Sequence, residues 1–552
     1  MSTVHQKGQR FWAALLAVIL MALSTACQIV APSPPTVTEP LKVLLLPLDS
    51  RPVNTQHVAL LARMAGYRLF IPPGEMLDQY LEPGDSARLM EWLSGTLPQV
   101  DAAIIVSNGL LSGGLIASRH PRSYSELSQR MQSLSDLLQE HQALDVTLIS
   151  VLPRQLPTQH GNAGWAYREQ LTRYGQLADM AVQSLATTSQ LAELTELQQT
   201  LPTQILQDYQ LVYTASRAIC EQLLHLTTSG AVDRLAITLD DAAPFGLANL
   251  HQRELMQQAE QLGVQDRVYG LTGADEISML ALARLVLDRS GVSPEFWLHF
   301  EQPSDAETVA LFESAPLLTA IREKIEFSGA VIGDSQAGNQ VFVHARPGDA
   351  HAGTVAASVS AQRALGRQTG VIDVALVNQA DLVFTAELYR LAGADAIDSY
   401  AGWNTASNAI GSVISHLAVR SAIRPQLASL QPSDPELRDR LGADLEYRLL
   451  HLLDAAGYQA SVRGQLTDWA RQMRFPAELI PSYQLQETNA ELTRRMQPLI
   501  DQWSDIMRGP FTYQLVPGHL TELAVESWEC QVQLPWPRLF EVQITPKVHL
   551  AP

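Results

Sequence analysis

The feature that most limits the fold of this chain is a repeated alternation of short apolar runs with longer amphipathic stretches. In residues 125–138 and 277–287, apolar residues recur at positions i, i+3 and i+4, which is the spacing of one helix face. The apolar runs predict strands at 43–48, 68–71, 102–107, 145–151, 234–240, 267–272, 296–301 and 329–333. Strands that alternate with helices favour parallel pairing. The chain is therefore predicted to be an α/β protein.

The number and spacing of these units predict a domain organisation. Eight strand–helix units within residues 42–335 fit a (β/α)8-barrel-like catalytic domain with a helical insertion at about 160–230. Doubly wound parallel sheets are the alternative architecture. The remainder of the chain predicts a second, smaller α/β part at 336–424, a helical segment at 425–510 and a β-rich tail at 511–552.

The N-terminus has the pattern of a targeting segment. A short positive region precedes the apolar run 11–23, and small residues then lead to Cys27. We therefore expect 1–27 to be a lipoprotein-type signal peptide and Cys27 to be the lipidated residue, although Ser24 stands where such signals usually carry a large aliphatic residue. Plain secretion and an uncleaved anchor are the alternatives. Residues 28–41 predict an extended linker, which places the protein in the cell envelope, extracytoplasmic, and attached to the membrane only through its lipid.

Composition excludes several classes of partner. The formal net charge of −19 argues against nucleic-acid binding by bulk electrostatics. Cys220 and Cys530 are too few and too far apart for a disulfide framework or a zinc site, and they could either pair or remain two thiols. The sequence also lacks a glycine-rich phosphate loop with its lysine. We predict no cofactor and no dedicated metal site, with a divalent cation left possible.

Two adjacent carboxylates follow the predicted strand 234–240. Side chains alternate along a strand, and Asp240 lies on the face that would look into a barrel. Asp241 can join it only if the strand has already ended, which the turn at Pro244 allows. The alternative is that one of the two aspartates caps the helix that follows.

A second acidic pair, Asp275 and Glu276, follows the predicted strand 267–272. The carboxyl ends of parallel strands meet at one edge of a sheet, where α/β enzymes carry their active sites. A helix cap formed by Asp275, with Glu276 in the first turn, is the alternative. The predicted catalytic residues are Asp240, Asp241, Asp275 and Glu276.

Other polar residues at strand ends are predicted to bind substrate. The planar guanidinium of Arg51 suits a carboxylate, which could be Asp49 in the same turn or a ligand. Tyr400 and Trp403 could offer flat faces to a sugar ring, although a tight turn and a helix cap would also explain this segment. The predicted binding residues are Asp49, Arg51, Asn54, Asn108, Arg119, Arg154, Tyr400, Trp403 and Asn404.

Four motifs in this order resemble one bacterial family, the domain of unknown function 4127 family. They are LDSRPVN at 48–54, DDAAPFG at 240–246, GADE at 273–276 and YAGWNT at 400–405. The resemblance extends from about Lys42 to the C-terminus and implies membership without implying a reaction. The matching positions are Asp49, Arg51, Asn54, Asp240, Asp241, Asp275, Glu276, Trp403 and Asn404, and Ser50 stands where the resemblance implies a second aspartate.

The strand-end carboxylates favour an extracytoplasmic hydrolase, of glycoside hydrolase type, acting on a saccharide. Adjacent aspartates after a barrel strand are similar to the pair in glycosidases that use the substrate's own acetamido group, which is an analogy of chemistry only. Asp240 would orient or activate the nucleophile and Asp241 would be the general acid/base. The alternatives are a divalent-metal-dependent hydrolase and a tethered solute-binding lipoprotein for a small molecule.

Overall fold

A computed structural model describes residues 39–551 of the chain. The predicted signal peptide, Cys27 and most of the linker at 28–41 lie outside the described residues. From Leu41 onward the chain forms one unit, and its two parallel sheets are described below.

The first sheet has six parallel strands in the order β2-β1-β3-β4-β5-β6. Its strands are β1 (Lys42–Leu46), β2 (Arg68–Phe70), β3 (Ala102–Val106), β4 (Asp145–Leu152), β5 (Arg234–Leu239) and β6 (Val268–Thr272). Several of them are continuous apolar runs because helices cover both faces of a parallel sheet. The edge strands β2 and β6 do not pair with each other, so the sheet is open.

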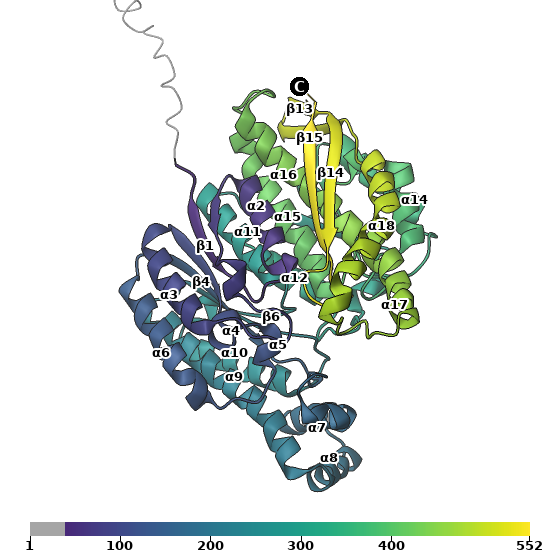
Figure 1. The fold of residues 1–552 in the computed structure, drawn as a ribbon. Coiled ribbons are helices and arrows are strands. Elements are labelled where there is room, and N and C mark those ends of the chain that lie inside the picture. The colour runs from purple at the N-terminus through teal and green to yellow at the C-terminus, as the bar shows by residue number, and fades with distance from the viewer. Residues whose placement is uncertain (1–38, 552) are drawn as a thin grey trace, which may run out of the picture. The chain divides into compact units, whose positions relative to one another are not determined.

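Alternate residues of the first sheet enter two different cores. Leu44 and Leu46 pack with helices on the outer face, whereas Val43 and Leu45 belong to a core that continues into the second sheet. The outer helices are α3 (Ser86–Thr96), α6 (Tyr124–Glu140), α9 (Thr203–Ser229) and α10 (Leu247–Gln261), and the inner ones are α2 (Gln56–Ala65) and α11 (Ile277–Ser290). Figure 1 shows this arrangement around β1 and β4.

The second sheet has five parallel strands in the order β11-β10-β9-β7-β8. Its strands are β7 (Glu295–Phe300), β8 (Val331–Ile332), β9 (Asn339–His344), β10 (Gln368–Asp373) and β11 (Ser399–Ala401). The accompanying helices are α12 (Leu317–Phe327), α13 (Ala352–Ala364), α14 (Leu382–Ala392) and α15 (Ala406–Leu427). Helices α11 and α15 pack on each other and are apolar and buried around most of their circumference, as expected for helices between two layers.

This topology corrects the predicted barrel. All eight predicted strands of 42–335 are present, but the last two belong to the second sheet, where β7 pairs with both β8 and β9. The expected boundary at 335 therefore falls inside a sheet. The class is mixed α/β with parallel sheets, and the strand orders are compatible with the doubly wound alternative. The alternation of strands and helices specifies parallel pairing, but it does not specify whether the sheet closes. A closed barrel and an open doubly wound sheet bury the same apolar runs.

The predicted insertion lies between β4 and β5. It contains α7 (Arg168–Val182), α8 (Thr188–Thr200) and α9, and Figure 1 shows α7 and α8 extending together beyond the sheet. Cys220 on α9 is buried and donates to Ser150 Oγ at 3.3 Å. Cys220 and Cys530 are both free, so the paired alternative is not what the structure has.

The C-terminal part is helical and then β-rich. Its helices are α16 (Pro435–Leu452), a π-helical stretch (Leu453–Val462), α17 (Arg463–Gln472) and α18 (Ser482–Ile506). Two antiparallel hairpins follow, formed by β12 (Phe511–Val516) with β13 (His519–Leu523) and by β14 (Val525–Gln533) with β15 (Gln543–Leu550). The β-rich tail predicted at 511–552 is present, but residues 534–542 within it form an irregular loop, here called the tail loop.

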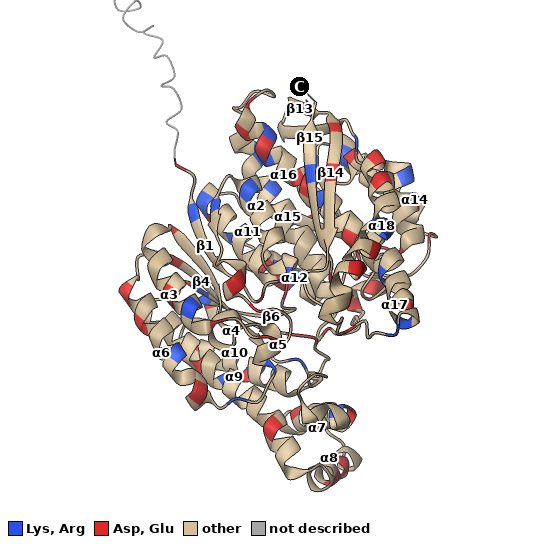
Figure 2. Ribbon diagram, in the orientation of Figure 1, with Lys and Arg blue, Asp and Glu red and all other residues tan. Residues whose placement is uncertain are grey.

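Charged residues of both signs are interspersed along these helices, as Figure 2 shows for α16 and α18. Ion pairs join distant segments: Arg63 on α2 reaches Glu446 on α16 at 2.6 Å and Asp439 at 2.8 Å. The helical part is thereby attached to the first sheet through α2, which packs along α16.

Candidate active site

Loops from the carboxyl ends of both sheets surround a cavity of about 300 Å³. Open α/β sheets bind ligands outside the carboxyl ends of their strands. The charged residues of the wall are Arg51, Arg119, Arg154, Arg538, Asp240, Asp241, Asp275 and Glu478, and its aromatic residues are Tyr80, Trp165, Phe312, Trp536 and Phe540, with His160 beside them. Segments far apart in the sequence therefore supply one polar, aromatic-lined cavity.

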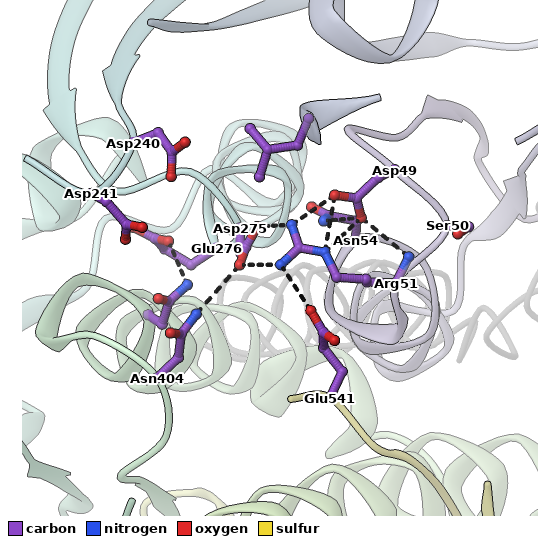
Figure 3. Close-up of polar contacts among 12 residues, drawn as sticks. Asp49, Ser50, Arg51, Asn54, Asp240, Asp241, Asp275, Glu276, Asn404 and Glu541 are labelled. Atoms are coloured by element: carbon purple, nitrogen blue, oxygen red, sulfur yellow. Dashed lines mark hydrogen bonds and ion pairs between the residues drawn. The ribbon is translucent and has the colours of Figure 1, made fainter. Parts of the chain in front are cut away.

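Arg51 occupies the centre of an ion-pair network beside this cavity. Its Nη2 lies 2.6 Å from Asp49 Oδ2 and 2.5 Å from Asp275 Oδ1, and Figure 3 shows the guanidinium between the two carboxylates. Asn54 Nδ2 donates to Asp49 Oδ1 at 2.8 Å. The guanidinium is thus shared by the loops after β1 and β6. Its side chain is 93% buried, and the acids around it compensate its charge.

Asp275 titrates above its ordinary range because it is buried. Burial raises the pKa of Asp275 to about 6, and the charge of Arg51 opposes this shift. Asp275 does not cap α11, since the N-cap position is Glu276 and no side-chain cap bond forms there. The cap alternative for Asp275 is therefore not realised.

Asp240 and Asp241 follow β5 and have unequal environments. Asp240 is buried, and its Oδ2 accepts from Arg119 Nε at 2.9 Å and Nη2 at 2.5 Å. The Asp241 side chain is 32% exposed and lies 3.4 Å from Arg154 Nη1. Burial and the neighbouring Asp240 carboxylate raise the pKa of Asp241. Neither aspartate caps α10, whose N-cap is Gly246.

The backbone around the cavity is unusually constrained. Five of the seven non-glycine residues with positive φ in the described chain line this one cavity: Tyr80, Asp241, Phe312, Asn378 and Asn404. At Asp241 φ is 29°, and side chains with a Cβ rarely adopt this region. Strained backbone persists where the surroundings enforce it, and it clusters at functional sites.

The second sheet contributes to the same wall through the loop after β11. Asn404 Nδ2 donates to Asp275 Oδ2 at 3.5 Å, and its φ is 56°. Thr405 is the N-cap of α15 and forms a capping box with Asn408. Because Thr405 performs the capping, the side chain of Asn404 is free to reach across to the first sheet.

Glu276 lies away from the cavity. Its side chain is fully buried, with Lys324 Nζ 3.4 Å from Oε1 and Asn408 donating to Oε2 at 3.1 Å. Burial raises its pKa to about 7. A Cβ at Gly411 would stand 2.2 Å from Glu276 Cγ, so α15 passes directly over this residue. Glu276 is placed to hold α11 to α15, and not to face a substrate in the cavity.

Three other predicted residues also face elsewhere. Asn108 exchanges two hydrogen bonds with the Val151 backbone, at 2.9 and 2.8 Å. Tyr400 is buried, and its hydroxyl donates to Asp373 at 2.9 Å. Trp403 donates to Ser412 Oγ at 3.2 Å and lines two neighbouring cavities. These side chains form hydrogen bonds with internal partners. Residue type alone does not distinguish such a structural role from substrate binding.

The tail loop supplies residues that the sequence did not single out. Trp536 Nε1 donates to Ser50 Oγ at 2.8 Å across 486 residues of sequence. The guanidinium carbons of Arg51 and Arg538 lie 5.2 and 4.9 Å from the Trp536 ring centroid, within cation–π range. The only signal was the cluster of aromatics and arginine in 536–540, which nothing in the sequence connected with residue 50.

No group of three or more His, Cys, Asp or Glu side chains within residues 39–551 is arranged to hold a metal ion. The acids of the cavity instead have arginine partners, as described for Asp240, Asp241 and Asp275.

Two open parallel sheets with a charged cavity at their carboxyl edges define a two-sheet α/β protein with a polar cleft. The chain belongs to the family described as "Protein of unknown function (DUF4127)", whose model matches residues 43–545. The predicted resemblance is therefore confirmed over nearly the whole chain.

Comparisons beyond the family give little more. No curated protein matches the chain significantly. Two solved structures are weakly similar: FabMG, an enoyl-acyl carrier protein reductase in its apo form, has 10% identity and a TM-score of 0.21 and covers 76% of this chain and 96% of its own. The first ketoreductase of the tylosin PKS has 11% identity and a TM-score of 0.15, with 71% and 78% covered. Similarity at this level carries no argument about function.

Proposed function

We propose that this protein is a hydrolase of glycoside hydrolase type whose active site is the 300 Å³ cavity. The observation that carries the proposal is that the two adjacent acids on its wall, Asp240 and Asp241, have different environments. Asp240 is buried and held by Arg119, whereas Asp241 is partly exposed, has a raised pKa and adopts a strained backbone. Glycosidic bond hydrolysis commonly needs two carboxyl groups in different protonation states.

In this proposal Asp241 donates its proton to the leaving glycosidic oxygen as the C–O bond breaks. Asp240, ionised beside Arg119, orients the nucleophile, which is the substrate's acetamido oxygen or a water molecule. Water finally supplies hydroxyl to the anomeric carbon, and its other proton restores Asp241. Asp275 is the alternative partner, since it lies on the same wall with a pKa of about 6.

The remaining wall supports a saccharide as substrate. Trp165, Phe312 and Phe540 are the partly exposed aromatic residues of the wall, and sugar rings stack on flat apolar faces of this kind. Arg154 has a single ion-pair contact with Asp241 at 3.4 Å, and that contact weakens when Asp241 is protonated. A carboxylate or hydroxyl group of the substrate would then complete its hydrogen bonding.

Two other functions are separable by experiment. A divalent-metal-dependent hydrolase would lose activity on chelation. The arginine partners of Asp240, Asp241 and Asp275 argue against this function, because they already neutralise the negative charge that would bind a cation. A tethered solute-binding protein would bind a saccharide without turnover. A cleft between two α/β layers suits such a protein, but the strain at Asp241 has no evident use in one.

We propose an extracytoplasmic, lipid-anchored location from the N-terminal pattern alone. Among the described residues, no helix combines the length and the hydropathy that crossing a bilayer requires.

The pH dependence of activity tests the proposed acid. Because Asp241 must be protonated and its pKa is raised, kcat/KM on the most active glycan or nitrophenyl glycoside of a panel should fall as pH increases through that pKa. Asp241→Asn should remove this limb from the residual activity, and the exposed-helix control Asp136→Asn should keep it. A profile that rises with pH, or a limb that survives in Asp241→Asn, would contradict the assignment.

A further inference from the structure

A second cavity of about 220 Å³ adjoins the first, and the two share Asn404 and Thr405 in their walls. The loops after β7, β9, β10 and β11 all contribute to it: Thr308, Ala310 and Leu311 follow β7, Ala345 follows β9, 373–377 ends β10, and 403–406 follows β11. It therefore lies over the carboxyl ends of four parallel strands. Doubly wound sheets bind ligands at this position.

The wall of this second cavity combines apolar side chains with the polar Thr308, Asn404 and Thr405 and one charged group. Leu311, Leu317, Val374, Leu376 and Trp403 supply much of its surface, and Asp373 is its single charged residue. The indole nitrogen of Trp403 is already bonded to Ser412, so the ring offers the cavity an apolar face. Small-molecule sites have this character, with an apolar lining and a few placed polar groups.

Asp373 has one carboxylate oxygen that is fully engaged and one that is not. Its Oδ2 accepts from the Asp381 N–H at 2.8 Å and from Tyr400 Oη at 2.9 Å. Its Oδ1 accepts only one long bond, from the Ala375 N–H at 3.4 Å. A carboxylate oxygen has acceptor capacity for two donors. Although Asp373 is buried on the cavity wall, its Oδ1 atom therefore retains acceptor capacity for a donor supplied by a ligand.

The local charge balance favours a cation. The carboxylates of Asp373, Glu301 and Asp381 lie at this edge of the second sheet, and His344 is the basic group among them. His344 Nδ1 lies 2.6 Å from Glu301 Oε1, and its Nε2 lies 3.3 Å from Asp381 Oδ2. Arg346 is directed to Asp305 instead. Even a protonated His344 leaves this edge of the sheet negative.

The close fit of the surrounding backbone fixes Asp373 in place. A Cβ at Gly402 would stand 3.0 Å from both Asp373 Cβ and Tyr400 Oη, so β11 approaches β10 as closely as glycine allows. A carboxylate that is held by two donors and by this contact is preorganised, which reduces the entropy lost on binding.

We propose that this second cavity is a binding subsite for an organic ammonium group with a small apolar or aromatic body. The ammonium donates to Asp373 Oδ1, and the apolar body packs against Leu376 and the Trp403 ring. This subsite is separate from the proposed hydrolysis at Asp240 and Asp241, and it stands whether or not that proposal holds.

The test compares two probes of nearly equal shape, benzylammonium chloride and benzyl alcohol, by calorimetry on the full chain. Wild-type protein should bind benzylammonium at least about tenfold more tightly, because only the ammonium can form a charge-assisted hydrogen bond with the carboxylate. Asp373→Asn should remove that preference. Leu376→Trp, which puts a larger side chain on the cavity wall, should abolish binding of both probes, and Asp136→Asn should change neither.

Equal affinity of wild-type protein for the two probes would overturn the proposal, and so would failure to bind benzylammonium. A preference that persists in Asp373→Asn would also overturn it. If Asp373→Asn does not fold, Leu376→Trp decides alone: retained benzylammonium binding in that variant, with an unchanged melting temperature, would place the ligand elsewhere.

Discussion

Asp240→Asn and Asp241→Asn should each reduce kcat of saccharide hydrolysis by at least about 100-fold, the smallest contribution expected of a positioned general acid or base. Asparagine preserves the shape of each side chain but cannot donate or hold the proton. The Arg119 contact would also weaken in Asp240→Asn, because it now joins a cation to an ionised acid at 2.5 Å. The measurement is kcat on the best substrate of the panel, with folding checked by circular dichroism.

The matched control is Asp136→Asn on the exposed face of α6, where kcat should be unchanged. A loss smaller than about tenfold in both active-site variants, roughly 1.4 kcal/mol of barrier, is too little for the proposed roles. That outcome would leave the cavity as a binding site without the proposed acid chemistry.

Arg51→Met should lower the free energy of unfolding by about 3–5 kcal/mol, since it leaves the buried carboxylates of Asp49 and Asp275 without their shared cation. Methionine keeps much of the volume, so lost charge compensation dominates over lost packing. The double variant Arg51→Met/Asp275→Asn should recover part of the loss, because one of the two uncompensated charges is gone. Urea unfolding followed by fluorescence measures each value.

An exposed ion pair provides the comparison for Arg51. Arg471 lies 2.7 Å from Asp468, and both side chains are more than half exposed. Arg471→Met should therefore cost less than about 1 kcal/mol. Equal costs for the two arginines would show that the Arg51 network does not hold the first sheet's loops together.

Much of the fold could be predicted because strand and helix spacing is local. The apolar run at 42–46 and the helical spacing at 277–290 are each visible within a few residues. Sheet closure is a long-range property, and the same run at 295–300 could enter either sheet. The structure shows that this run joins the second sheet, because it pairs with β9 from Phe296 opposite Asn339 onward.

The acids of the cavity could also be predicted, because parallel strands carry their carboxyl ends to one edge. Arg51 joins Asp275 to Asp49, and Asp240, paired with Arg119, lines the same cavity as Asp275. Glu276 was expected beside Asp275, but the start of α11 turns adjacent side chains in different directions, and Glu276 points into the layer between α11 and α15. Sequence alone could not distinguish the two.

The tail loop could not be predicted as part of the site. Its Trp536 bonds Ser50, which lies 486 residues earlier in the chain. An aromatic residue in a β-rich segment is also what a packed hairpin contains, so the sequence did not indicate this contact. Residues 539–542 lie within the predicted β-rich tail at 511–552, but they form no strand. They stay irregular because Phe540 and Glu541 contact the cavity and Arg538 instead of a neighbouring strand.

The most direct test of the central claim is hydrolysis in oxygen-18-labelled water, with the products analysed by mass spectrometry. If the cavity hydrolyses a glycosidic bond, wild-type protein incorporates label at the newly formed reducing end, and Asp241→Asn does so at least about 100-fold more slowly. If no glycan of the panel acquires label with wild-type protein, or if Asp241→Asn labels it at the wild-type rate, hydrolysis by these acids is contradicted.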